Sequence, residues 1–432
     1  MKRYSIYILV ISCMLMFGIT SIHSQQVNTL YFLENAPMRH LINPAFQPVS
    51  NVYVTLPVIG YSSAWVGNNA FTMKDFIFTD KNGNTITPYH PNANPDWLAK
   101  KPKNTLIDAD AYINLFGLGV RIKDNGYFHL NISEHIIAGA ATGTNIFGIN
   151  QLDSGLIGPF NLGANALVYT DFALGYSHKI NDQWTVGGKF KFLVGQAYVN
   201  ANLDNISLAH SMEELHAYGN GNIVAAAPLQ WQNLPTDVTD LGNIDTEALA
   251  GTDYRDWITP AGLGAAFDLG ATYKPHEQVQ ISASVTDLGF IRWTNLAKGN
   301  LSIDTTFTGV ELNYGDYVYE GELNQDSLTA HLTNTLNGYA DALNISDIDN
   351  NAKPLTRMLT ANLHVGVDAN FWDNRVGVGV HSRTRFYNNV VTEELTLGAA
   401  FRPFNWVNIA ASYSFINGHW SNLGAALSLA PY

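Results

Sequence analysis

From residue 359 onward the chain alternates between apolar and polar side chains, and this period of two constrains the fold more than any other feature. Between Leu359 and Phe371 every second residue is apolar, namely Leu359, Ala361, Leu363, Val365, Val367, Ala369 and Phe371. Because successive side chains of a strand point to opposite faces, the pattern predicts a β-strand with one apolar and one polar face. Four further segments repeat it, at residues 375–381, 395–402, 407–415 and 422–429.

Consecutive amphipathic strands of this length, joined by tight turns, are typical of a transmembrane β-barrel. Soluble sandwiches also alternate, but their strands usually have about 5–6 residues. Charged residues make up 14% of the chain and aromatic residues 12%, against about 25% charged residues in soluble domains. We therefore predict an all-β fold, a transmembrane antiparallel β-barrel of about 14 strands, within a range of about 12 to 16, with long extracellular loops.

The first 24 residues have the features of a secretory signal peptide. Lys2 and Arg3 precede a short apolar run, Ile6–Ile19, and cleavage is expected after Ser24. A lipoprotein signal at Cys13 is the alternative, but the apolar run continues past that residue. Cleavage would remove the chain's single cysteine and exclude disulfides. Together with the barrel pattern, an exported chain predicts an outer-membrane location.

Residues 25–48 lie between the signal peptide and the barrel, which we assign to residues 49–432. This segment contains Asn35-Ala36-Pro37 and Asn43-Pro44-Ala45, so it is rich in turn-forming residues and moderately apolar. We interpret it as an N-terminal periplasmic or plug segment inside the lumen. A disordered tail is the alternative.

Turn-forming residues predict short connections near residues 123–126, 180–182, 275–277, 373–374 and 403–405. Long connections are expected near 63–108, 139–164, 227–257 and 313–358, so short and long ends alternate as in a barrel whose C-terminus is periplasmic. Pro57 weakens a first strand near 50–61. Asn82-Gly83 predicts a hairpin within 76–87, and spaced leucines predict a short helix within 326–343.

Basic side chains are expected to face the lumen on the polar sides of these strands. The candidates for ligand binding are Lys189, Lys191, Arg375, His381, Arg383, Arg385 and Arg402. They could brace the wall by pairing with carboxylates, or they could bind an anionic headgroup. Many other inward residues are glycines, such as Gly187, Gly270, Gly366 and Gly398. Such small residues leave space for water, a ligand or a plug, and the sequence does not decide among these.

Motifs for catalysis, cofactors and metals are absent from the sequence. No G-x-S-x-G or H-E-x-x-H motif occurs, and His381 and Ser382 are adjacent on a strand, so they face opposite sides. The acidic stretch 347–351 departs from a calcium loop at Ala352 and Met358. We therefore expect no catalytic residues, no cofactor and no metal. A net charge of −13 without basic clusters argues against nucleic acid as a partner.

Three segments carry a family resemblance: Asn35–Phe46, Ile281–Trp293 and Asn422–Leu429. In them the chain resembles a family of Bacteroidota outer-membrane barrels known as a domain of unknown function. That family is distantly similar to FadL-type transporters and to the PorV and PorP/SprF-like barrels. The resemblance implies the barrel fold and the outer-membrane location, and it supplies no binding residues.

Two functions follow as hypotheses. The first is a FadL-like channel or transporter for small hydrophobic or amphipathic molecules, favoured by small lumen residues and a basic lining. The alternative is a scaffold or partner barrel of a type IX secretion or cell-surface assembly machine. The expected partners are the outer-membrane lipid bilayer, a small amphipathic ligand and, under the alternative, a secretion or surface protein.

Overall fold

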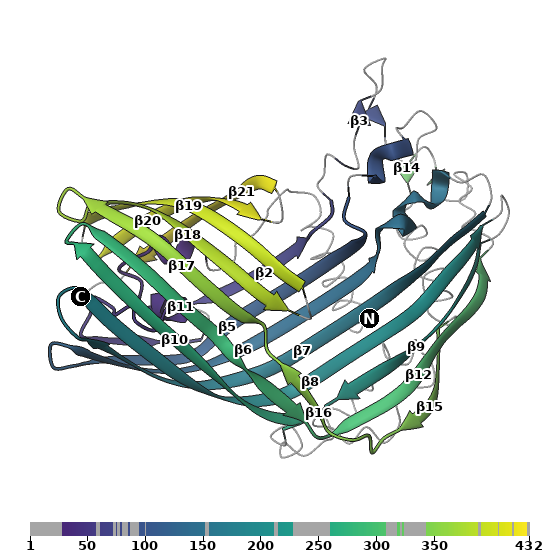
Figure 1. Ribbon diagram of the computed structural model, residues 1–432, viewed down its shortest axis with the longest axis horizontal. Coiled ribbons are helices and arrows are strands. Elements are labelled where there is room, and N and C mark those ends of the chain that lie inside the picture. The colour runs from purple at the N-terminus through teal and green to yellow at the C-terminus, as the bar shows by residue number, and fades with distance from the viewer. Residues whose placement is uncertain are drawn as a thin grey trace.

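A computed structural model of the protein shows one large antiparallel sheet of 17 strands that curls into a barrel (Figure 1). The structure describes residues 28–57, 61–71, 75, 78–79, 85–86, 95–99, 101–151, 155–210, 215–227, 260–307, 318–319, 322–323, 343–387, 390–404, 406–416 and 419–429. The predicted signal peptide and the predicted helix within 326–343 lie outside these residues.

The main sheet contains the following strands: β1 (Val52–Thr55), β2 (Ser62–Asn68), β5 (Asn104–Ile122), β6 (Gly126–Gly143), β7 (Gly155–Lys179), β8 (Trp184–His210), β9 (Leu215–Ala226), β10 (Gly262–His276), β11 (Val279–Trp293), β12 (Leu296–Phe307), β15 (Leu343–Asp349), β16 (Leu355–Met358), β17 (Ala361–Phe371), β18 (Val376–Tyr387), β19 (Val390–Phe404), β20 (Val407–Ile416) and β21 (His419–Leu429). The other elements are β3 (Phe78–Thr79), β4 (Thr85–Ile86), β13 (Val318–Tyr319), β14 (Glu322–Leu323) and four 3-10 helices, η1 (Asn28–Phe32), η2 (Pro37–Leu41), η3 (Pro95–Leu98) and η4 (Thr144–Gln151).

Several strands are pieces of one pass across the sheet. Both β1 and β2 pair with β5, and both β9 and β10 pair with β8. Their partners β12 and β11 are separated by two residues, and β15, β16 and β17 follow along that pair. The 17 strands described therefore make twelve passes. The preferred number of about 14 is not reached in the described residues, and the number for the whole chain stays a prediction.

The difference arises because several strands are much longer than expected. Strand β7 has 25 residues and β8 has 27, whereas about 9–11 residues cross a membrane. Residues 203–210, 215–226 and 300–307 continue passes already counted and add no further pass. Strands β5 to β9, β12 and β15 thus form a tall wall on one side of the barrel (Figure 1).

The expected alternation of short and long connections is wrong at one end. The short turns near 123–126, 180–182, 275–277, 373–374 and 403–405 lie where predicted. At the other end, β8–β9, β18–β19 and β20–β21 are also joined by short connections, and the predicted connection 139–164 is mostly strand. The insertion between β9 and β10 interrupts one pass of the sheet, because both strands pair with β8. It therefore does not begin at the rim of the barrel.

Pro57 and the Asn82-Gly83 pair affect the neighbouring strands as predicted. The first pass is interrupted between Thr55 and Ser62, where Pro57 cannot donate a ladder hydrogen bond. Strands β3 and β4 pair antiparallel on either side of Asn82-Gly83, which confirms the hairpin. Strand β21 pairs with β20, and among the described residues no backbone pairing joins it to β1 or β2.

The faces of the sheet follow the period of two. On β17 the side chains of Val365 and Val367 are each 44% exposed on the outer face, whereas Asn362 and His364 are buried. On β10 the outer face carries Phe267 and Leu269, both more than half exposed. Many of the strands expose large apolar residues in this way, which is an apolar area far larger than a soluble monomer shows.

Aromatic side chains lie along the edge of this apolar band at the end of the barrel that carries the five short turns, which we call the turn end. Trp184 stacks on Tyr273 with ring centroids 4.6 Å apart, and Phe404 stacks on Trp406 at 5.8 Å. Aromatic rings at the edge of an apolar band are typical of barrels at a membrane interface. None of the helices in the described ranges is long and apolar enough to cross a membrane.

A single charge can test whether the band faces lipid. We expect Phe267→Arg to make folding into a bilayer less favourable by about 2–4 kcal/mol, because an arginine near the midplane must be desolvated. The matched control is Tyr218→Arg, on the tall wall, where Tyr218 is exposed beside Asp304. Equal effects of the two changes in a lipid-vesicle folding titration would contradict a lipid-facing band.

Candidate functional site in the barrel lumen

The N-terminal segment, residues 28–46, lies against the inner face of the sheet at the turn end. Almost all of its side chains are buried. It contacts strands around the ring through the hydrogen bonds Asn28 Nδ2 to Glu394 Oε2 at 2.9 Å, Thr29 Oγ1 with Ser412 Oγ at 2.7 Å, Tyr31 Oη with Ser282 Oγ at 2.9 Å, and Ser284 Oγ to the Ile42 carbonyl at 2.6 Å. The segment therefore occupies this part of the lumen.

Four inward glycines make room for the segment. A Cβ atom on Gly187 would collide with the backbone of Pro44, and one on Gly270 would collide with the Asn43 side chain. The same holds for Gly366 against the ring of Tyr31 and for Gly398 against the ring of Phe32. At these positions the space left by small inward residues is thus taken by the chain's own N-terminal segment.

Three of the seven basic candidates hold this segment. The Arg402 guanidinium lies 3.1 Å from the Glu34 carboxylate. His381 stacks on Tyr31 with ring centroids 4.6 Å apart. Lys189 Nζ lies 3.1 Å from His40 Nδ1 and donates to the His40 carbonyl at 3.2 Å.

The protonation of His40 follows from these contacts. An ammonium group has no acceptor, so Nδ1 of His40 accepts from Lys189, and Nε2–H is left to donate to the hydroxyl of Tyr53 at 2.9 Å. Burial, with His129 and Lys189 close by, lowers the pKa of His40 well below its ordinary value. His40 is therefore a neutral imidazole when the segment is in place.

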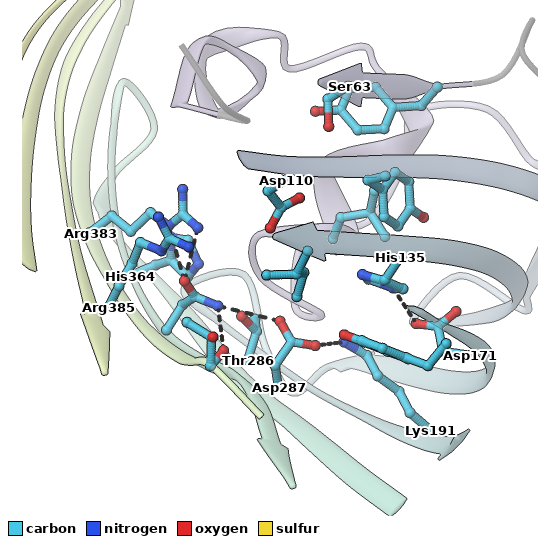
Figure 2. Close-up of a pocket in the computed structure, with 17 residues that line it drawn as sticks. Ser63, Asp110, His135, Asp171, Lys191, Thr286, Asp287, His364, Arg383 and Arg385 are labelled. Carbon is cyan, nitrogen blue, oxygen red and sulfur yellow. Dashed lines mark hydrogen bonds and ion pairs between the residues drawn. The ribbon is translucent and has the colours of Figure 1, made fainter. Parts of the chain in front are cut away.

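Beyond the N-terminal segment lies a second compartment, the lumen cavity, of about 110 Å³ (Figure 2). Leu41 of the segment contributes to its wall. Of the basic candidates, Lys191, Arg383 and Arg385 line it. The other lining residues are Tyr61, Ser63, Asp110, Tyr112, His135, Ile137, Tyr169, Asp171, Thr286, Asp287, Thr360, Asn362 and His364.

The three cations of the lumen cavity have acidic or amide partners. Lys191 Nζ lies 2.9 Å from Asp268 and 2.5 Å from Asp287. Arg383 donates from Nε and Nη2 to Asn362 Oδ1 at 3.1 and 2.9 Å, and Arg385 donates to Asp108 at 3.3 Å. These contacts support the wall-bracing role, because buried charges in a barrel are stable when paired.

A β-bulge shapes one wall of the cavity. Asp287 has a φ of 61°, and the register between β10 and β11 shifts between Phe267 and Leu269. The Asp287 amide donates to Asp268 Oδ1 at 2.8 Å. A non-glycine residue with positive φ is uncommon, and bulges are frequent beside functional sites. Asp287 belongs to the stretch 281–293 that carries the family resemblance.

The seventh candidate, Arg375, does not line the lumen cavity. It shares the parity of Arg383 and Arg385, but β18 begins only at Val376, and Arg375 is exposed at the end of the preceding turn. The expectation that the three arginines lie together on the inner face is therefore wrong. The Arg402 amide still donates to the Arg375 carbonyl at 2.8 Å, but this position lies at the very end of the pass, where the Arg375 side chain is exposed.

Several cavity residues escaped the sequence analysis. Tyr112, His135 and Tyr169 form an aromatic cluster in which His135 stacks on Tyr169 at 4.5 Å. Asp171 lies 3.3 Å from His135. For the three aromatic residues, inward parity on their strands is the sequence signal that would place them in the lumen. In the described ranges no group of three or more His, Cys, Asp or Glu side chains is placed to hold a metal ion.

The fold and the lumen define an antiparallel β-barrel whose interior is partly occupied by its own N-terminal segment. Residues 44–432 match the model of a family of unknown function (DUF5723), so the chain belongs to that family. No curated protein matches the sequence.

Among solved structures, the chain is similar to the toluene transporter TodX of Pseudomonas putida, with 10% identity over 91% of this chain and 89% of that chain and a TM-score of 0.36. It is also similar to the toluene transporter TbuX of Ralstonia pickettii, with 8% identity over 85% and 73% and a TM-score of 0.35. It is also similar to the translocator domain of the autotransporter NalP from Neisseria meningitidis, with 8% identity over 94% of this chain and 96% of that chain and a TM-score of 0.33. These scores are too low to transfer a function.

The glycine contacts predict a sharp difference between neighbouring positions. We expect Gly187→Ala to displace the N-terminal segment at a cost of about 1–3 kcal/mol, because the new methyl group meets the Pro44 backbone. Gly188→Ala, on the outer face, brings its methyl group only to 3.6 Å from Leu269 and should change little. Hydrogen exchange of residues 28–46 measures both variants, and equal exchange would contradict the packing role of Gly187.

Acidification should loosen the same segment. The pKa of His40 is lowered in the folded state, so the stability it contributes is present above its ordinary value of about 6.5 and is lost as the pH falls below it. The loss should approach about 1.4 kcal/mol per pH unit. Hydrogen exchange between pH 8 and pH 5, corrected for the intrinsic rate, measures it. His40→Gln keeps polar contacts without titrating, and an unchanged pH profile in this variant would assign the effect to other groups.

Proposed function

We propose that the protein is an outer-membrane barrel that acts as a channel or transporter for small amphipathic molecules. The observation that carries this proposal is the lumen cavity, an unfilled compartment of about 110 Å³ next to the N-terminal segment. A barrel that served only as a scaffold would have no need to keep such a compartment open. The apolar outer band with its aromatic edge supports the membrane location.

The N-terminal segment, in this proposal, is a plug that closes the turn end of the lumen. Its seating depends on a few polar contacts, such as Glu34 with Arg402 and Tyr31 with Ser282. Displacement of the segment would connect the lumen cavity with the turn side. The lining favours amphipathic over purely apolar molecules, because tyrosine rings and paired charges share one wall.

Solute entry into proteoliposomes tests the proposal. We expect slow entry of small polar and amphipathic solutes through the intact protein and severalfold faster entry through Gly187→Ala, in which the segment is displaced. Gly188→Ala is the matched control and should behave like the intact protein.

Failure of both Gly187→Ala and the intact protein to pass any solute would contradict a channel. The scaffold alternative makes a different prediction, namely that a secretion or surface protein co-purifies stoichiometrically from the native membrane while solute entry stays at the level of empty liposomes.

A further inference from the structure

The charges around the lumen cavity balance. Its lining holds three cations, Lys191, Arg383 and Arg385, and three carboxylates, Asp110, Asp171 and Asp287. Figure 2 shows the two arginines at one end, Lys191 with Asp171 at the other, and Asp110 and Asp287 between them. A compartment that is neutral overall but alternates positive and negative groups favours a guest that carries both charges, and it offers no net attraction to a simple anion.

Unused hydrogen-bonding capacity remains on both sides. Arg385 is 8% exposed and its Nε has no hydrogen-bond partner, and Asp171 is 4% exposed with Oδ1 unpartnered. Within the part of the chain that the structure describes, Asp110 has neither a hydrogen bond nor an ion pair. Buried polar atoms are normally satisfied by protein, water or a ligand, so the Arg385 and Asp171 atoms mark where a polar guest would bind. The half-buried Asp110 offers a further acceptor in the cavity lining.

The distance between the Arg385 and Asp110 side chains matches a short dipolar molecule. Arg385 of β18 reaches across the lumen to Asp108 of β5 at 3.3 Å. Asp110 is two residues farther along β5 on the same face, about 7 Å away by strand geometry. The carboxylate and ammonium groups of an α-amino acid, each with a hydrogen bond of about 2.8 Å, span a gap of this size.

The size of the cavity limits the side chain. A cavity of about 150 Å³ holds a molecule such as benzene, and the lumen cavity is somewhat smaller, at about 110 Å³. A guest of about six non-hydrogen atoms, such as alanine, therefore fits. The rings of Tyr61 and Tyr112, with centroids 5.6 Å apart, offer an apolar surface for a small aliphatic group.

We propose that the lumen cavity is a binding site for small zwitterions, with the guest's carboxylate on Arg385 and its ammonium group on Asp110. This inference rests on the proposed channel function and names its substrate class, a small amino acid. It replaces the anionic headgroup as the proposed ligand, because the carboxylates in the lining balance the three cations.

Equilibrium dialysis of the detergent-solubilised full chain against radiolabelled L-alanine tests the site without requiring transport. Unlabelled L-alanine should compete with the label. Alanine methyl ester, which lacks the carboxylate, and propionate, which lacks the ammonium group, should each compete at least about tenfold more weakly, because each loses one of the two charge-assisted hydrogen bonds.

Substitutions locate the site. Asp110→Asn keeps the shape of a side chain that has no hydrogen bond or ion pair among the described residues, so the fold should be kept, and binding should fall about tenfold. Arg385→Gln should weaken binding at least as much, although it also removes the contact with Asp108. Arg375→Gln, at an exposed turn, is the matched control and should bind like the unaltered protein.

The outcomes separate this inference from the proposed function. Preferential binding of alanine that Asp110→Asn weakens supports it. Three results would each overturn it: equal competition by propionate, unchanged binding in Asp110→Asn, or no binding of L-alanine at about 10 mM, a concentration at which even weak millimolar affinities are detected. In the last case, solute entry into proteoliposomes would still decide separately whether the barrel is a channel.

Discussion

The close approach of the N-terminal segment to glycine-bearing strands is the contact on which the rest of the lumen depends. Pro44 lies directly against the backbone of Gly187, and Asn43 lies against Gly270. A side chain at either glycine would force the segment away from the wall. Because polar groups of the segment are buried at the same time, displacement would also remove Glu34 from Arg402 and His40 from Lys189.

This contact divides the interior into a filled and an open compartment. The charges divide with it, since Lys189, His381 and Arg402 face the segment, whereas Lys191, Arg383 and Arg385 face the lumen cavity. Two lysines two residues apart on β8 therefore have different neighbours, His40 for one and Asp287 for the other. The basic residues thus have different partners in the two compartments, and Asp268 links them, because it lies 3.6 Å from Lys189 and 2.9 Å from Lys191.

The outer face and most strands were predictable because the period of two is a local property. Val365 and Val367 could be placed outside, and His364 inside, from their spacing alone. The neighbours of the N-terminal segment could not be placed, because Thr29 meets a residue 383 positions away. The bulge at Asp287 could not be predicted either, since it depends on backbone register, and neither could the exposure of Arg375 at the end of its pass. The length of β7 and β8, which run far beyond one membrane thickness, also could not be predicted from the alternation.

The long sequence separations of the segment have a consequence for the order of assembly. Asn28 bonds to Glu394 and Thr29 to Ser412, across 366 and 383 residues. Contacts with such separations form late, because the intervening chain must be ordered before they contribute. The first residues of the barrel to be synthesised thus reach their final place only after β19 and β20 are inserted. The N-terminal segment is therefore buried only after the barrel wall has folded.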